Sequence, residues 1–256
     1  MLMNRNSISH LVDLLHINSP SVTFLANIER IDVRKKLNLA EFEKLTGGDD
    51  FTEQLIAFEQ HNYSFAQFFE NIVIEKGIPH LRSIAIKMVA EELFDSKYIR
   101  EDKTGKLKSF KKSAIQLANF LKDFSDELGE SQDDAYLSGL FFYLPNLAKV
   151  IVADESQEFE ETILNNFEEY LGSTLSGMGF SPFITTMVSD SQKDFLSVSF
   201  PLAQALARIG RNAYDLISQE GRNALSDWYP ERQMLDIAGL GRRQIFEIIK
   251  KQVSKH

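Results

Sequence analysis

The feature that most constrains the fold is an almost wholly apolar segment in the middle of the chain, from Ala135 to Ile151. Ser131 precedes Asp134 by three residues, which is the capping-box spacing at the start of a helix. Because the residues that follow are apolar on nearly all sides, the pattern predicts a central, buried helix. Pro145 lacks the amide hydrogen that a helix interior needs, so this helix is expected to stop or kink just before it.

Helical periodicity continues along nearly the whole chain, and the alternation typical of β-strands is absent. Asn38 is placed to cap a short helix that Gly47 ends, and Ser181 and Ser199 each precede a proline suited to a first helical turn. The segment from Leu171 to Gly179 is rich in glycine and serine, and we expect a loop there. The fold class predicted from these patterns is all-α.

Four stretches carry a family resemblance: Ser19-Pro-Ser-Val22, Ile78-Pro-His-Leu-Arg-Ser-Ile-Ala-Ile86, Phe110-Lys-Lys-Ser113 and Gly139-Leu-Phe-Phe-Tyr-Leu-Pro-Asn-Leu147. In order and spacing they resemble the HDOD family, the signalling relatives of the HD-domain phosphohydrolases, from about Ser19 to Leu225. In that register Phe142 and Tyr143 stand where the name-giving His-Asp pair would be. Lys112 takes the place of the His in the family's Trp-x-His-Ser motif.

The resemblance implies a two-lobed helical fold: an N-terminal lobe over 1–97, a degenerate HD-like bundle over 98–225, and a C-terminal helical appendix over 226–256. It also implies a non-catalytic regulatory or scaffold module of bacterial signalling, which acts by binding a protein partner. Two alternatives stay open: a divergent HD phosphohydrolase acting on a nucleotide, and a pseudoenzyme that binds a nucleotide. The oligomeric state is left open.

The sequence offers no candidate catalytic or metal-binding residue. An HD hydrolase needs several imidazoles and carboxylates around one or two metal ions, and none of the five histidines falls at a matching position. The chain has no cysteine, which excludes thiolate sites and disulfides. Since no phosphate-cradling or dinucleotide motif occurs either, no cofactor is expected. We expect Phe142 and Tyr143 to be packing residues that fill the space of the family's metal site.

The charge and hydropathy of the chain limit the classes of partner that it is expected to bind. The net charge of −9 argues against general nucleic-acid binding, which needs a basic surface. No window reaches the length of about 18–20 apolar residues that a membrane span requires. The N-terminal stretch lacks the features of a signal peptide. We therefore expect a cytoplasmic protein without an integral membrane segment.

The segment from Lys97 to Lys112 is basic, although the chain as a whole is acidic. It contains seven basic residues and only two acidic ones, Glu101 and Asp102. Thr104 and Gly105 suggest a turn. One interpretation is a solvated loop between the lobes. The other is a binding surface for an anion or an acidic partner, whose candidate residues are Lys106, Lys108, Lys111 and Lys112.

A complementary acidic segment runs from Asp154 to Glu169, with seven acids, Glu168 among them, and no base. Its apolar residues recur at helical spacing and predict one buried face. The acidic face is interpreted either as plainly solvated or as a partner of the basic segment, in the same chain or across a dimer.

Overall fold

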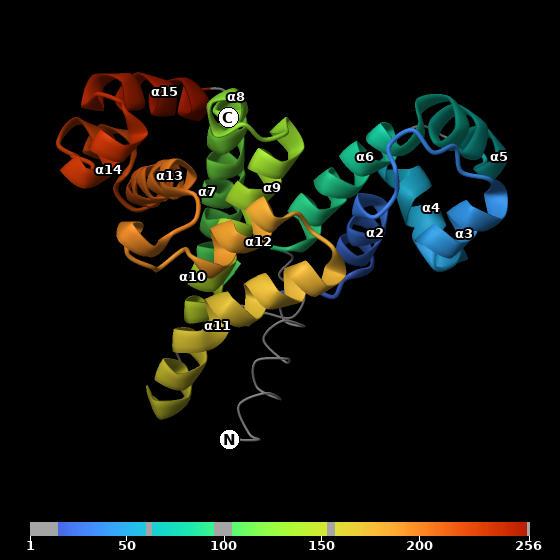
Figure 1. Cartoon of the computed structure of the whole chain (residues 1–256), viewed down its shortest axis with the longest axis horizontal. Helices are drawn as coiled ribbons and strands as arrows, with labels where there is room; N and C mark the ends of the chain where they lie inside the picture. Colours follow the sequence, from blue (N-terminus) through green and yellow to red (C-terminus); the bar gives the residue numbers. More distant parts are fainter. Residues whose placement is uncertain (1–14, 60–62, 95–103, 153–156, 255–256) are drawn as a thin grey trace. The chain divides into compact units, whose positions relative to one another are not determined.

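The computed structural model of the chain describes residues 15–59, 63–94, 104–152 and 157–254. Every regular element in these ranges is a helix, which confirms the predicted all-α class (Figure 1). The described residues form two compact units, a smaller one of residues 16–94 with 177–180 and a larger one of the rest. Within these described ranges, no helix is both long enough and apolar enough to cross a membrane.

The smaller unit is built from six consecutive helical elements. They are α2 (Pro20–Glu29), α3 (Leu39–Thr46), α4 (Asp49–Phe58), α5 (Phe65–Phe68), the π-helix η1 (Phe69–Lys76) and α6 (Gly77–Glu92). Helices α2 and α6 pack together, and a largely buried ion pair joins them, with 2.7 Å between Arg82 Nε of α6 and Glu29 Oε1 of α2. Between α2 and α4, the rings of Phe24 and Phe51 meet edge to face with 5.2 Å between centroids.

The caps predicted for this unit are confirmed. Asn38 and Glu41 form a reciprocal capping box at the start of α3, since the Asn38 side chain accepts from the Glu41 amide and the Glu41 carboxylate accepts from the Asn38 amide. Gly47 ends the helix in the left-handed conformation, with φ of 74°. Both ends of α3 are therefore marked by local signals in the sequence.

The larger unit contains the remaining elements. They are α7 (Thr104–Asp123), α8 (Ser125–Leu128), α9 (Gln132–Phe142), α10 (Leu144–Val152), most of α11 (Gln157–Met178), α12 (Pro182–Ser189), the 3-10 turn η4 (Phe195–Ser197), α13 (Pro201–Glu220), the 3-10 turn η5 (Arg222–Ser226), α14 (Arg232–Ala238) and α15 (Arg242–Ser254). In Figure 1, α7 lies in the middle of this unit, between α9 and α13.

Two glycines allow these three helices to approach closely. A Cβ atom added to Gly139 of α9 would lie 2.7 Å from Cα of Ala118 in α7. A Cβ added to Gly210 of α13 would lie 2.7 Å from Cδ1 of Leu117, the neighbouring residue of α7. Because real Cβ atoms do not come this close to another carbon, only glycine fits at either position without a shift of its surroundings.

The apolar mid-chain segment is a broken, buried helix, as predicted. Ser131 caps α9, and its hydroxyl accepts a hydrogen bond of 3.0 Å from the amide of Asp134. The helix ends at Phe142, Tyr143 follows as the cap residue, and α10 then starts with Pro145 in its first turn. A first turn tolerates proline because its amides have no partner within the helix.

Two segments that were predicted to be a turn and a loop are helical instead. Thr104 and Gly105 do not form a turn but begin α7, a 20-residue helix that includes the lysine-rich part of the basic segment. Its apolar face, with Leu107, Ala114 and Leu121 buried, stabilises the helix despite the surrounding charge.

The glycine-rich segment from Leu171 to Gly179 is also mostly helical, because α11 extends to Met178. Gly172 lies against α12, where an added Cβ would be 2.8 Å from Cβ of Ser189. This glycine serves close packing of two helices rather than a turn.

The described residues of the segment 226–254, predicted as a C-terminal appendix, are grouped with the larger unit. Helix α15 packs on α7 and buries Ile245 and Ile249 completely. Arg222 donates a hydrogen bond of 2.8 Å to the carbonyl of Val253, and Arg242 donates one of 2.8 Å to the carbonyl of Ser226. These contacts bind α15 to the preceding chain.

Candidate functional site

The break between α9 and α10 brings Tyr143 into the centre of the larger unit. Its side chain is fully buried, and its hydroxyl donates a hydrogen bond of 2.9 Å to Oδ1 of Asp215 and also lies 3.3 Å from the carbonyl oxygen of Arg211. The ring of Phe110 from α7 meets the Tyr143 ring edge to face, at 6.4 Å between centroids. One side chain at the break therefore connects α9, α7 and α13.

The electrostatics of this cluster favour a neutral tyrosine as the donor. Burial, followed by the charge of Asp215 and the hydrogen bond to it, raises the pKa of Tyr143 well above its usual value. Burial also raises the pKa of Asp215, although the hydrogen bond from Tyr143 and the charge of Arg211 act in the opposite direction. Because the pKa of Tyr143 is raised, its hydroxyl stays protonated and donates a hydrogen bond to the Asp215 carboxylate.

Phe142 is fully buried on the neighbouring side of the break. The guanidinium carbon of Arg211 lies 5.2 Å from the centre of the Phe142 ring, a cation–π arrangement. Burial lowers the pKa of Arg211, whereas the charges of Asp215 and Glu168 favour its ionised form. Glu168 is only 8% exposed, so its assignment to a solvated acidic face is wrong.

Arg211 also lines a polar cleft of about 460 Å³ on the larger unit. The cleft lies between three parts of the chain: the segment 191–195 after α12, the middle of α13, and the start of α14. Arg208 and Arg211, one turn apart on α13, lie on one side. Asp194 and Glu231 also line it, so the cleft carries both signs of charge.

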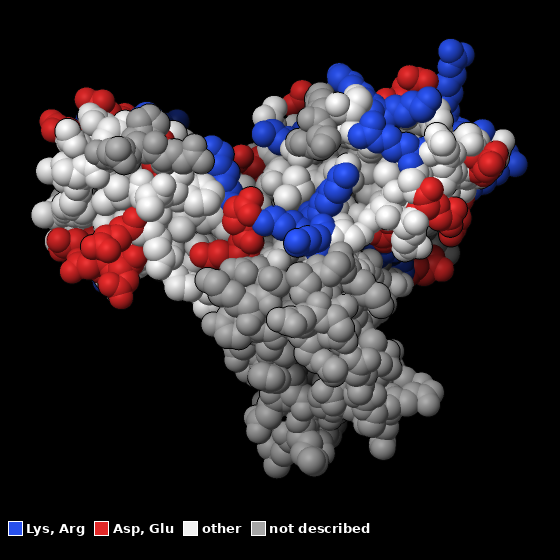
Figure 2. Space-filling view, turned by 180° about the vertical axis from the view of Figure 1, so that it is seen from behind, with Lys and Arg blue, Asp and Glu red and all other residues white. Residues whose placement is uncertain are grey.

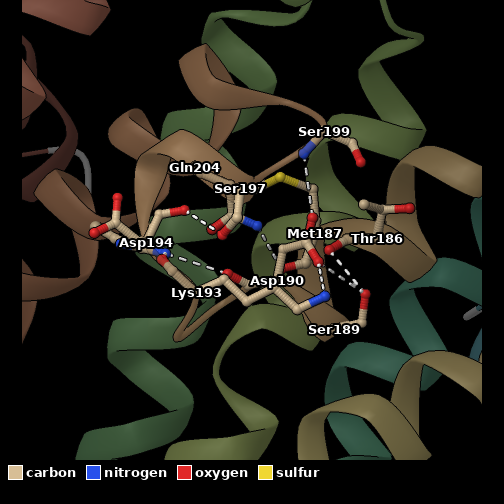
Figure 3. A network of polar contacts seen from close by, with 10 residues as sticks. Thr186, Met187, Ser189, Asp190, Lys193, Asp194, Ser197, Ser199 and Gln204 are labelled. Carbon is tan, nitrogen blue, oxygen red and sulfur yellow. Dashed lines mark hydrogen bonds and ion pairs between the residues drawn. The ribbon is translucent and has the colours of Figure 1, made fainter.

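The segment beside the cleft is held by a network around Asp190, which is 4% exposed (Figure 3). Lys193 Nζ lies 2.7 Å from Oδ1 of Asp190, and the amide of Ser199 donates to Oδ2 at 3.2 Å. Gln204 donates a hydrogen bond of 2.9 Å to the carbonyl of Met187. These bonds fix the turn that connects α12 to α13.

Arg208 completes this support from α13. Its Nη2 donates to the carbonyls of Asp190, at 3.2 Å, and of Lys193. The guanidinium carbon lies 4.3 Å from the centre of the Phe195 ring. Burial, followed by repulsion from Arg211, lowers the pKa of Arg208. The arrangement presents a partly buried guanidinium beside the cleft.

The candidate lysines of the basic segment lie on the first turns of α7 rather than in a loop. Lys108 and Lys112 are exposed and Lys111 is half-buried, while the side chain of Lys106 lies outside the described side chains. The residues of this stretch that reach Tyr143 are Phe110 and Ser113. Lys112, which takes the place of the family's His, is exposed to solvent.

Basic and acidic side chains both occur on the surface of the described residues in the view of Figure 2. A mixed face of this kind fits a protein partner better than a nucleic acid, which favours uninterrupted positive charge.

The cleft and its two arginines were not predicted from the sequence. A signal was present, since Arg208, Arg211 and Asp215 are separated by three and four residues and therefore share one face of α13. The other wall comes from the segment 191–195 and the start of α14, whose positions depend on tertiary packing. Spacing on a single helix could have predicted the charged stripe but not the cleft.

Among the described residues, no group of three or more His, Asp or Glu side chains is gathered closely enough to hold a metal ion. Comparison with protein-family models, with curated proteins and with solved structures finds no match to this chain. The resemblance to the HDOD family therefore stays a prediction from the sequence motifs.

Proposed function

We propose that this chain is a non-catalytic, HDOD-like regulatory module of bacterial signalling that acts in the cytoplasm by binding a protein partner. The observation that carries the proposal is the burial of Tyr143 and its hydrogen bond to Asp215. In the resembled family this position, with its neighbour, holds the His-Asp pair. Here it holds two buried aromatic rings, Phe142 and Tyr143, neither of which is a metal ligand of the HD type.

The competing function is a divergent HD phosphohydrolase, and an activity assay separates the two. Purified protein is incubated with added Mn²⁺, Fe²⁺ or Mg²⁺ and with phosphomonoester, phosphodiester and nucleotide substrates. We expect no turnover above that of an Asp215→Asn variant, and no near-stoichiometric iron, manganese or zinc by elemental analysis. Turnover that the Asp215→Asn variant abolishes would overturn the proposal.

Partner binding is tested by affinity capture from the native cell, followed by reconstitution with the identified protein. The matched baits are the natural chain and a variant with Lys108, Lys111 and Lys112 all changed to Glu. If the start of α7 is part of the recognition surface, the variant associates more slowly, and the difference shrinks as salt is added. The fold should survive because surface charges contribute little stability.

A partner that binds both baits with the same rate and affinity at low salt would exclude the lysines of α7 from the interface. It would leave the proposed module function in place, with a different recognition surface. Failure of any protein to bind directly in the reconstituted experiment would contradict the module function itself.

A further inference from the structure

The cleft beside Arg208 and Arg211 has the dimensions of a small-molecule site. Its volume of about 460 Å³ falls in the range of roughly 300–1,000 Å³ that ligand pockets occupy. Its walls come from elements that are fixed by packing and hydrogen bonds, among them α13 and the turn held by Asp190. A cleft with rigid walls can bind a ligand without a large ordering cost.

Two polar groups at the cleft are buried and have no hydrogen-bond partner within the described part of the chain. They are Oγ of Ser191, a residue only 1% exposed, and Nε of Arg208. Both residues line the cleft. A buried polar group without a partner destabilises a fold, so such groups are uncommon and point to a missing water or ligand. Both can donate a hydrogen bond, so the group that satisfies them is an acceptor.

The charges define that acceptor further. Lys193 is paired with Asp190 at 2.7 Å, and the charge of Arg211 is favoured by Asp215 and Glu168. Arg208 makes its hydrogen bonds to two backbone carbonyls, and the charges of Asp194, Glu231 and Asp190 favour its ionised form. An oxyanion beside Arg208 would also relieve its repulsion from Arg211.

We propose that the cleft binds a small molecule with one phosphate or carboxylate group, held by Arg208 and Ser191, and with hydroxyl or amino groups that donate to Asp194 and Glu231. The two carboxylates argue against a ligand with several negative charges, because the second charge would meet them. A nucleoside triphosphate is therefore expected to bind more weakly than a phosphorylated polyol. The site is independent of the proposed partner binding.

The test is isothermal titration calorimetry of the full chain at low salt with four probes: inorganic phosphate, glycerol 3-phosphate, glycolate and glycerol. We expect saturable binding of glycerol 3-phosphate or of glycolate at one per chain, and none of glycerol. The preferred probe distinguishes a phosphate site from a carboxylate site. Absence of saturable binding by all three anions at millimolar concentration would mean that the cleft holds only solvent, and would overturn the proposal.

Variants assign the binding to the cleft. Loss of a charge-assisted hydrogen bond in Arg208→Gln should weaken binding about ten- to a hundredfold, and loss of a neutral one in Ser191→Ala about two- to tenfold. The control Arg243→Gln removes one exposed arginine outside the cleft and should leave affinity unchanged.

Arg208→Gln could also disturb the turn, since Arg208 holds two of its carbonyls. Ser191→Ala removes a hydroxyl without a partner, so its fold should be preserved, and thermal melts verify this. If a folded Ser191→Ala variant binds the anion with unchanged affinity, and Arg243→Gln weakens binding as much as Arg208→Gln does, the anion binds elsewhere. That result would overturn the proposal.

Discussion

The hydroxyl of Tyr143 donates a hydrogen bond of 2.9 Å to Asp215, 72 residues later in the chain. The first residue marks the break between α9 and α10, and the second lies on α13. The bond therefore connects the most apolar segment of the sequence to the helix that carries the cleft arginines. Tyr143 is fully buried and Asp215 is half-buried, so the bond is better shielded from water than a surface contact and its energetic value is larger.

Tyr143→Phe should lower the free energy of unfolding by about 1.5–3 kcal/mol, the usual range for a hydrogen bond to a charged group. The aromatic ring is retained, so the change isolates the hydroxyl. Urea denaturation with an unchanged m-value measures the loss. Tyr229→Phe is the control, because Tyr229 is 71% exposed. If both variants lose the same amount, the Asp215 bond contributes nothing specific.

Phe142→Ala should cost roughly 3–5 kcal/mol, as large-to-small substitutions in a packed core do. The ring is fully buried and contacts the guanidinium of Arg211, so both packing and a cation–π contact are lost. Phe65→Ala provides the comparison, because Phe65 is 40% exposed. Denaturant melts of the two variants should differ clearly, and a loss for Phe142→Ala no larger than that for Phe65→Ala would mean that Phe142 is not a core residue.

Gly139→Ala should destabilise the fold by about 1–3 kcal/mol or more, because its new methyl group would overlap the backbone of α7. Gly177→Ala is the matched change in α11, where an added Cβ meets nothing within 4 Å. That variant should gain about 0.4–1 kcal/mol, because alanine restricts the unfolded chain. Thermal and urea unfolding of both variants checks the opposite signs, and a neutral Gly139→Ala would show that α7 and α9 can separate without cost.

A pH-dependent contribution is expected from Glu59 in the smaller unit, whose carboxylate lies 2.8 Å from Nε2 of His80. Burial raises the pKa of Glu59, but the hydrogen bond and charge of His80 and the charge of Lys76 outweigh it, so the pKa is lowered below 4.5. A lowered pKa means that the ionised carboxylate stabilises the folded state above pH 4.5 and loses this effect as pH falls through the folded-state pKa.

The measurement compares the natural chain with Glu59→Gln by urea denaturation at several pH values. The natural chain should be more stable at neutral pH, and its advantage should shrink below pH 4.5. Glu53→Gln, which changes an exposed carboxylate on α4, corrects for the loss of one acidic group. An advantage that persists unchanged at the lowest pH would rule out ionisation of Glu59 as its source.

The helices and many of their ends could be predicted from the sequence because their signals are local. Ser131 is recognisable as a cap from the spacing to Asp134, and Pro145 as a break from its missing amide. The glycine- and serine-rich pattern around Gly172 predicts a loop, because the packing role of this glycine depends on Ser189 of the next helix, which only folding brings close. The cleft could not be predicted from the sequence for the same reason, since Ser191 and Arg208 line it together only after α12 and α13 have packed.

The glycine contacts on α7 have a consequence for descent. Gly139 and Gly210 touch adjoining residues of one helix, Ala118 and Leu117, from α9 and from α13. A side chain at Gly139 would press against the backbone of α7, and one at Gly210 would press against the side chains of Leu117 and Phe120. Proteins that share ancestry with this chain should therefore retain small residues at these two places, 71 positions apart in the sequence, long after their surfaces have diverged. That pair is a signature by which remote members of the lineage can be recognised.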